Sequence, residues 1–141
     1  GIPDQINKIR LSNYEAKGYF NSGVLLINLK AQRESVTEEM IYEYVEEHKS
    51  ELILPDQDIL NGLFGENILP MDDTLYNYDP RQYEMYRMLS SGEMDMDWVM
   101  KNTSIIHFCG KNKPWDKYVR NRFSILYKHY AALAQREETF F

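Results

Sequence analysis

Three residues within one short stretch are of types that commonly bind metal ions and phosphates. The stretch is IIHFCGKNKPW, residues 105–115, in which His107 follows two β-branched residues. A neutral imidazole is a common metal ligand, and Gly110 lets backbone N–H groups approach an anion closely. Lys113 adds a compact positive charge. The alternative is an ordinary strand that runs into a turn, with His107 as a plain core or surface histidine.

A second polar group, Asp56-Gln57-Asp58, follows Pro55 and precedes an apolar stripe that ends at Gly65. Proline is favoured in the first turn of a helix and glycine at its end, so we expect a helix from Pro55 to Gly65. The polar trio then lies at the helix N-terminus, where an aspartate caps the helix and interacts with its dipole. The same exposure suits ligand binding. We expect Asp58 to be an orienting or capping residue.

The segment YFNSGVLLINL, residues 19–29, contains Asn21 beside a continuous apolar run. Because residues 24–27 are apolar on both alternating faces, they predict a strand buried in a layered sheet with helices on both sides. A buried amide without a partner costs about 1 to 3 kcal/mol. We therefore expect Asn21 to be hydrogen-bonded, either to backbone or to a ligand hydroxyl. Residues 105–109 predict a second strand that delivers His107 to the edge of the sheet, where open α/β sheets bind ligands.

The remaining elements are predicted mainly from helical periodicity. Ser35 and Glu38 have the spacing of a capping box, which predicts an amphipathic helix ending near residues 48–50. Further predicted elements are a connecting segment with one helical turn at residues 1–18, a short helix after Pro80, and a long amphipathic helix from about Tyr118 to Tyr130. No internal repeat or domain boundary stands out, so residues 1–141 are expected to belong to a single domain.

Composition excludes several classes of function. Of the 141 residues, 43% are hydrophobic, and the formal charge of −6 has the wrong sign for non-specific binding to nucleic acid. No window reaches the roughly 18 consecutive apolar residues that a membrane-spanning helix needs. The single cysteine, Cys109, excludes an internal disulfide and a multi-cysteine zinc site, and we interpret it as a small apolar residue without a neighbouring base. His48 and His129 lie among helix-surface charges and are expected to be solvated.

Three motifs resemble, in order and spacing, the C-terminal half of a glycosyltransferase family 8 domain. They are FNSGV at residues 20–24, DQDILN at residues 56–61, and HFCG followed by KPW within residues 107–115. The family includes bacterial lipopolysaccharide galactosyl- and glucosyltransferases and glycogenin. The resemblance covers about residues 19–115 and leaves a helical tail after it.

The resemblance implies a retaining hexosyltransferase of GT-A type that moves glucose or galactose from a UDP-sugar with the help of Mn²⁺. It implies an α/β fold of which this chain is the C-terminal part, a mixed sheet with flanking helices. The nucleotide-binding half, with the Asp-x-Asp pair that supplies further metal ligands, is expected before residue 1. Asp95-Met96-Asp97 has the same pattern, but it follows a polar turn rather than a buried strand, and we do not expect it to bind metal.

Roles for single residues follow from the same resemblance. It implies that His107 binds Mn²⁺ and that Gly110 and Lys113 bind the diphosphate, whereas Lys111 is expected to be exposed surface. The metal would neutralise charge that develops as UDP leaves.

The resemblance also implies contacts with the donor sugar. Asp56 is expected to accept hydrogen bonds from sugar hydroxyls, and Asn21 to bind another hydroxyl. Gln57 is expected near the anomeric carbon, where its amide oxygen stabilises an oxocarbenium-like transition state. Because an amide is a poor nucleophile, front-face displacement is preferred to a covalent intermediate on Gln57.

The expected partners are a UDP-hexose donor and a glycan or lipid-linked saccharide acceptor, with no nucleic acid. We expect a cytoplasmic location, free or peripheral to the inner membrane face. A second copy of the chain is a further expected partner, because the strand at residues 24–29 needs sheet neighbours. The alternative function is non-catalytic: a fragment or degenerate module that dimerises or binds sugar weakly.

The isolated 141-residue chain is expected to release no UDP from a UDP-hexose, because one histidine cannot hold Mn²⁺ and the sequence shows no uridine pocket. An assay for free UDP, with and without Mn²⁺, measures this. Mn²⁺-dependent release above the rate of a His107→Ala variant would contradict the expectation.

Overall fold

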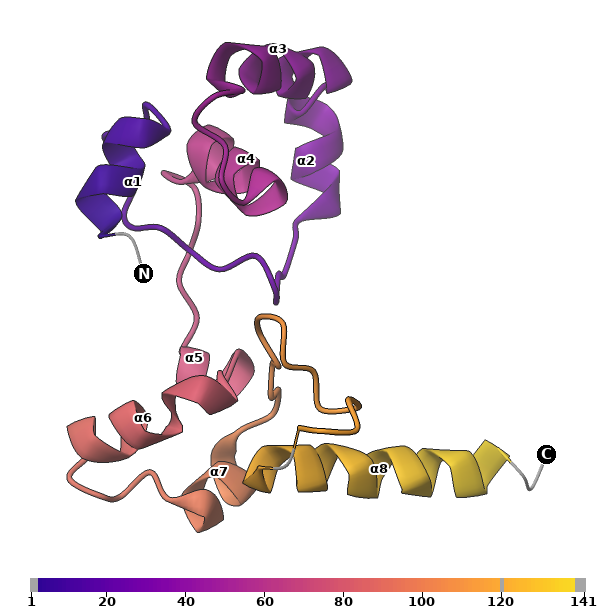
Figure 1. Cartoon of the computed structure of the whole chain (residues 1–141). Coiled ribbons are helices and arrows are strands. Elements are labelled where there is room, and N and C mark those ends of the chain that lie inside the picture. Colours follow the sequence, from indigo (N-terminus) through magenta and orange to yellow (C-terminus); the bar gives the residue numbers. More distant parts are fainter. Residues whose placement is uncertain (1–2, 120, 139–141) are drawn as a thin grey trace. The chain divides into compact units, whose positions relative to one another are not determined.

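Helices joined by extended segments and turns make up the described residues of the chain, 3–119 and 121–138, in a computed structural model (Figure 1). The chain divides into two units, Gly1–Met71 and Asp72–Phe141, and each is described by itself. None of the described helices is long and apolar enough to cross a membrane. That the whole chain belongs to one domain stays a prediction.

The described residues of unit 1 form four helices, and many of the buried side chains among them are polar. The helices are α1 (Asp4–Arg10), α2 (Leu29–Ser35), α3 (Glu38–His48) and α4 (Pro55–Phe64). The helix predicted after Pro55 is confirmed, and the N–H of Gly65 ends it by donating to Asn61 O at 3.0 Å. Besides Leu11, Ala16 and Tyr44, the buried side chains of this unit include asparagines and the Asp58 carboxylate.

The helix α3 begins at a different residue from the one predicted. Its N-cap is Thr37, whose hydroxyl accepts a hydrogen bond from Met40 N at 3.2 Å, whereas Ser35 closes the last turn of α2. The predicted capping box on Ser35 is therefore wrong. The chain bends between α2 and α3, so the N-cap of α3 lies two residues later, at Thr37. The predicted end near residues 48–50 is confirmed by the last helical residue, His48.

His48 is buried rather than solvated, so that prediction is also wrong. Its ring stacks on Tyr44 with centroids 4.1 Å apart, and its Nδ1 lies 3.1 Å from Tyr44 O. Tyr44 in turn donates its hydroxyl to Leu11 O at 3.1 Å, and burial raises the pKa of this phenol to about 12. The charged neighbours of His48 in the sequence occupy other faces of the helix.

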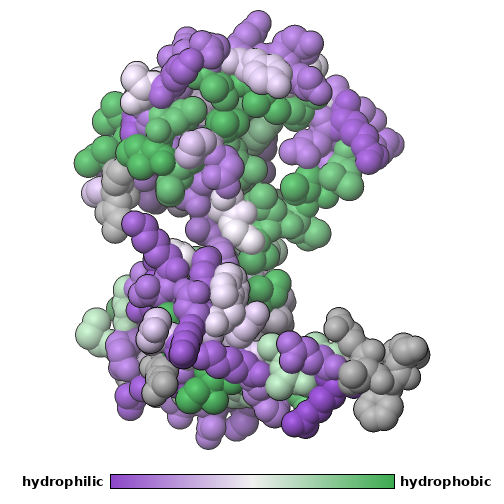
Figure 2. Space-filling model, turned by 45° about the vertical axis from the view of Figure 1, so that its right-hand side comes forward, coloured by the Kyte–Doolittle hydropathy of each residue, from purple (hydrophilic) through white to green (hydrophobic). Residues whose placement is uncertain are grey.

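The predicted buried strand over residues 24–27 is wrong for this chain. These residues form no strand, and Leu26 is 90% exposed, with Leu25 and Ile27 close to half exposed. Their pattern does fit a strand, but a strand needs a hydrogen-bonded neighbour and a covering layer. Neither is present among the described residues, so the apolar side chains reach solvent, as hydrophobic groups do elsewhere on the molecule (Figure 2).

Unit 2 is built around aromatic side chains. Its helical elements are α5 (Asp73–Tyr76), the 3-10 helix η1 (Pro80–Gln82), α6 (Tyr83–Leu89), α7 (Met96–Asn102) and α8 (Arg122–Glu138). The helix expected after Pro80 is confirmed, and the C-terminal helix begins at Arg122, four residues later than expected. The buried cluster consists of Tyr78, Tyr83, Tyr86, Val99 and Phe123.

One isolated parallel bridge, between Tyr78 and Ile106, is the β-structure that the described residues contain. Tyr78 N donates to Ile105 O at 3.0 Å, and His107 N donates to Tyr78 O at 2.8 Å. The mixed sheet is therefore not confirmed. The second predicted strand survives as this bridge, which fixes the backbone of His107.

The Asp58 carboxylate is the most heavily bonded side chain of unit 1. Arg10 donates to both of its oxygens at 2.8 Å, and Tyr19 donates its hydroxyl at 2.5 Å. The backbone N–H groups of Ile53 and Leu54 donate at 2.6 and 2.9 Å. Burial alone would raise the pKa of Asp58, but these hydrogen bonds outweigh it and hold the pKa well below its usual range.

Asp58→Asn is expected to destabilise the chain by about 3 to 5 kcal/mol, because it removes one partner of a buried ion pair and leaves Arg10 uncompensated. Chemical denaturation at pH 7 measures this. Asp4→Asn, an exposed control in α1, should cost less than about 1 kcal/mol.

The same interaction predicts a pH dependence. Because the folded-state pKa of Asp58 is lowered, its contribution to stability is present above the unfolded pKa of about 4 and is lost as the pH falls below it. Wild-type stability should therefore drop more steeply than that of Asp58→Asn between pH 5 and 2, and parallel curves would contradict this account.

Candidate functional site

The first turns of α4 hold the extended segment at residues 19–22 through side chains. Asn61 accepts from Phe20 N and donates to Phe20 O, both at 2.7 Å, so it pairs with this backbone much as a neighbouring strand would. Tyr19 is held by Asp58, as described above. The segment that carries Asn21 is therefore fixed against the helix that carries Asp56 and Gln57.

Gln57 is 9% exposed, and its amide oxygen is already in use. It accepts from Asn21 Nδ2 and from Ser22 N, each at 3.2 Å. An amide oxygen has two lone pairs, so a ligand that uses this oxygen must displace one of the two donors. The structure thus brings Asn21 and Gln57 together, in contact with each other.

Asp56 lies exposed in the first turn of α4, where the helix dipole favours a carboxylate. Its Oδ2 accepts from Ser22 Oγ at 3.3 Å. Asn21 is exposed too, so the prediction that it is buried is wrong, although it is hydrogen-bonded as expected. Its partners include Gln57 and, through Oδ1, Gly23 N at 2.9 Å. These contacts leave Asp56 and Asn21 on one accessible surface of unit 1.

In unit 2 the half-buried His107 ring is oriented by a residue that sequence reasoning missed. Nδ1 lies 2.8 Å from Asn77 Oδ1. Because an amide oxygen only accepts, this pairing assigns the proton to Nδ1 and leaves the lone pair on Nε2. Metal-binding histidines are commonly held in this way by a hydrogen bond to the other ring nitrogen. Asn77 stands in a polar turn of the sequence, with no periodicity that links it to His107.

The ligand set for a metal is only partly present. Among the described residues, no group of three His, Cys, Asp or Glu side chains could hold a metal ion. The orientation of His107 fits a single nitrogen ligand. Asp95, from the alternative Asp-x-Asp pattern, instead caps α7 by accepting from Trp98 N at 2.9 Å.

Cys109 has a base beside it, contrary to the expectation from sequence. Its Sγ lies 3.2 Å from His107 Nδ1. That nitrogen is assigned as a donor, however, and burial followed by the charge of Asp79 raises the pKa of the thiol. The thiol is therefore neutral at ordinary pH, in line with its interpretation as a small packing residue.

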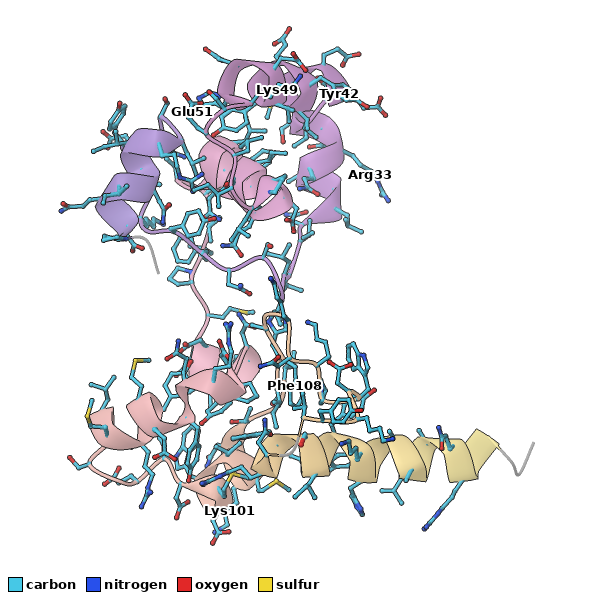
Figure 3. All side chains as sticks on the ribbon, in the orientation of Figure 1. Arg33, Tyr42, Lys49, Glu51, Lys101 and Phe108 are labelled. Carbon is cyan, nitrogen blue, oxygen red and sulfur yellow. The ribbon has the colours of Figure 1, made fainter. Side chains whose placement is uncertain are left out.

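In the loop after His107, Gly110 forms a turn and Lys113 is a cation anchored to the backbone. Gly110 has φ +78°, a left-handed conformation that favours glycine. Lys113 is half-buried and donates from Nζ to Phe108 O at 2.8 Å, so its ammonium is anchored to the loop backbone. Phe108 lies on this loop of unit 2 (Figure 3). Lys111 is exposed, as expected. Trp115 lies 60% exposed, with its ring 5.9 Å from Lys113 Nζ.

Comparison with known proteins identifies the class to which these motifs belong. They lie within a match to a family of enzymes that transfer sugars: the model of glycosyl transferase family 8 matches residues 3–118. The chain belongs to glycosyl transferase family 8.

Several bacterial relatives are similar over most of the chain. General stress protein A of Bacillus subtilis is 31% identical over an alignment of 122 residues, and the match covers 79% of this chain and 40% of the relative. Lipopolysaccharide glucosyltransferase WaaO of Escherichia coli is 37% identical over 103 residues, covering 71% of this chain and 28% of that protein. This chain thus spans less than half the length of these relatives.

A solved structure matches the fold of the chain. The galactosyltransferase LgtC, in complex with donor and acceptor sugar analogs, superposes with a TM-score of 0.67 at 28% identity. The match covers 89% of this chain and 46% of LgtC. A second LgtC structure, of an active-site mutant with glutamine replaced by glutamate, gives the same values.

Gln57→Ala is expected to free the Ser22 N–H, because Gln57 Oε1 is its acceptor. Loss of a hydrogen bond worth about 1 kcal/mol should speed amide hydrogen exchange at Ser22 by roughly fivefold. Gln32→Ala, in α2, is the matched control and should leave Ser22 unchanged. Equal protection in Gln57→Ala would show that the segment is held in another way.

Proposed function

We propose that this chain is the C-terminal part of a GT-A hexosyltransferase and binds the hexose and diphosphate of a nucleotide-sugar donor. The observation that carries the proposal is His107, held through Nδ1 by Asn77 with its Nε2 lone pair available, on the loop that also carries Gly110 and Lys113. Membership of family 8 and relatives named as lipopolysaccharide glucosyltransferases support it.

The loop of unit 2 has the chemistry for a diphosphate. His107 Nε2 would be one ligand of Mn²⁺, and when bound the metal would neutralise the diphosphate charge that grows as UDP leaves. Gly110 lets a phosphate approach the backbone, and Lys113 supplies a fixed positive charge to the leaving group. Because Lys113 is already anchored on Phe108 O, less side-chain entropy is lost when it binds.

The polar surface of unit 1 has the chemistry for a sugar. Asp56 can accept hydrogen bonds from donor hydroxyls, and Asn21 can donate to or accept from another. Gln57 would turn its amide oxygen to the anomeric carbon as positive charge develops there, exchanging its contact with Asn21 for that interaction. In LgtC, replacement of a glutamine by glutamate is an active-site mutation, which supports a role for Gln57. An amide is a weak nucleophile, so we propose front-face displacement with retention.

The partners are proposed at the level of chemical class. Relatives named for glucose or galactose transfer and the LgtC complex with sugar analogs support a UDP-hexose donor and a saccharide acceptor, free or lipid-linked. A cytoplasmic location and a homodimer stay predictions.

One observation favours a second candidate, a module that associates without catalysing transfer. The apolar residues Leu25, Leu26 and Ile27 are exposed, and a partner chain could cover them. Sedimentation of the isolated chain, together with a donor-binding titration, tests this: a stable dimer that does not bind a UDP-hexose would favour the second candidate.

In the active enzyme, His107→Ala is expected to lower Mn²⁺-dependent hexose transfer by at least 100-fold, because it removes a metal ligand. Asn77→Ala should weaken Mn²⁺ affinity by about 10- to 100-fold, since the ring loses the hydrogen bond that orients it. Activity measured against Mn²⁺ concentration separates the two effects, because excess metal rescues only Asn77→Ala.

His129→Ala, an exposed histidine of α8, is the matched control and should retain full activity. A His107→Ala enzyme that transfers sugar at the wild-type rate would remove His107 from the metal site.

A further inference from the structure

Arg81 is held by one carboxylate, which uses two of its three guanidinium nitrogens. Nε lies 2.9 and 3.0 Å from the two Asp79 oxygens, and Nη2 lies 2.6 Å from Oδ2. The Arg81 backbone N–H also donates to Asp79 at 3.0 Å. Burial alone would raise the pKa of Asp79, but the hydrogen bonds from Arg81 outweigh it and lower the pKa, so both groups are charged at neutral pH. The third nitrogen, Nη1, is left for another contact.

Nη1 lies against the backbone of Gly110, on the loop described above. A Cβ at residue 110 would be only 2.9 Å from it, so the glycine is needed for this approach as well as for its positive φ. The loop is therefore contacted by two fixed cations, Arg81 at Gly110 and Lys113 at Phe108 O.

We propose that Arg81 is a further anion-binding residue of this loop, with Nη1 donating to a phosphate oxygen of a ligand seated at Gly110. The proposal rests on the proposed function in placing a phosphate there. A guanidinium is well suited to phosphate because it is planar, weakly hydrated and always charged. The Asp79 contacts hold it in one orientation, so little side-chain entropy remains to be lost on binding.

The negative charge of Asp79 cancels much of the long-range electrostatic field of Arg81. Phosphate binding at this site therefore depends on the orientation of the Arg81 guanidinium rather than on net charge. Arg81 is 60% exposed, and a phosphate can reach it from solvent. The phosphate has two possible sources with the same chemistry, the diphosphate of the donor and a phosphate group on the acceptor saccharide.

The first test titrates the 141-residue chain with inorganic pyrophosphate in EDTA, so that no metal contributes, and follows the Gly110 amide by NMR. We expect a saturable shift in the wild type and at least fivefold weaker binding in Arg81→Gln. Arg81→Lys should also bind pyrophosphate weakly, because lysine keeps the positive charge but lacks the planar guanidinium that Asp79 holds in place. Arg87→Gln, an exposed arginine of α6, is the matched control and should bind within twofold of wild type.

The variant Asp79→Asn distinguishes binding that depends on the orientation of Arg81 from binding that depends on the net charge of the loop. The variant makes the loop more positive, so a site governed by net charge would bind pyrophosphate more tightly. The proposal expects weaker binding, because Arg81 is released. Tighter binding in Asp79→Asn, equal affinity in Arg81→Gln, or no saturable shift in the wild type would each overturn it.

Kinetics of the active enzyme then distinguish the two sources. A raised KM for the nucleotide sugar in Arg81→Gln assigns the donor, and a raised KM only for a phosphorylated acceptor assigns the acceptor. Unchanged KM values for both would overturn the proposal. Pyrophosphate binding does not require sugar transfer, so the two proposals can fail separately. If the chain binds pyrophosphate through Arg81 but the whole protein transfers no sugar, the proposed function is refuted and this inference stands.

Discussion

The buried carboxylate of Asp58 is the constraint on which unit 1 depends. It has no exposed surface, and moving a charged group out of water costs several kcal/mol unless its oxygens are fully hydrogen-bonded. Five donors meet that requirement, from α1, from Tyr19 and from the backbone before α4. Because these donors come from three separate parts of the chain, the carboxylate sets where α4 begins. The positions of Asp56 and Gln57 follow from that.

The same helix then replaces a sheet neighbour. Asn61 satisfies both backbone groups of Phe20, and Gln57 satisfies Ser22 N, so the extended segment is positioned by amide side chains rather than by a strand. Both asparagine and glutamine offer a donor and an acceptor together, which is what a peptide backbone offers. One motif of six residues, 56–61, thus combines a structural task with the proposed binding of sugar.

The features of the fold and of the candidate site that could be predicted from sequence are those whose residues lie close together in the chain. The helix after Pro55 and the candidate ligands at His107, Gly110 and Lys113 were predicted because their residues are close together in sequence. The network of Asp58 with Arg10 spans 48 residues, and the contact of His107 with Asn77 spans 30, so no periodicity reveals either.

Three errors have physical causes that a sequence pattern does not contain. Residues 24–27 have the composition of a buried strand, but burial depends on partners that composition does not supply. His48 is surrounded by charges along the chain, yet stacking on Tyr44 buries it. In the predicted capping box, Thr37 outcompetes Ser35 because the bend after α2 decides which residue caps.

The apolar run at residues 24–27, of which Leu25, Leu26 and Ile27 are exposed, has a consequence for handling the chain. From Tyr19 to Leu29 the sequence carries no charged residue, and its apolar part has high β-propensity with no proline. Segments of this kind nucleate cross-β aggregation when their backbone groups are unpaired, and charged gatekeepers normally flank them. Here Lys30 is the first such residue on the C-terminal side. The solubility of the chain therefore depends on how completely this run is covered.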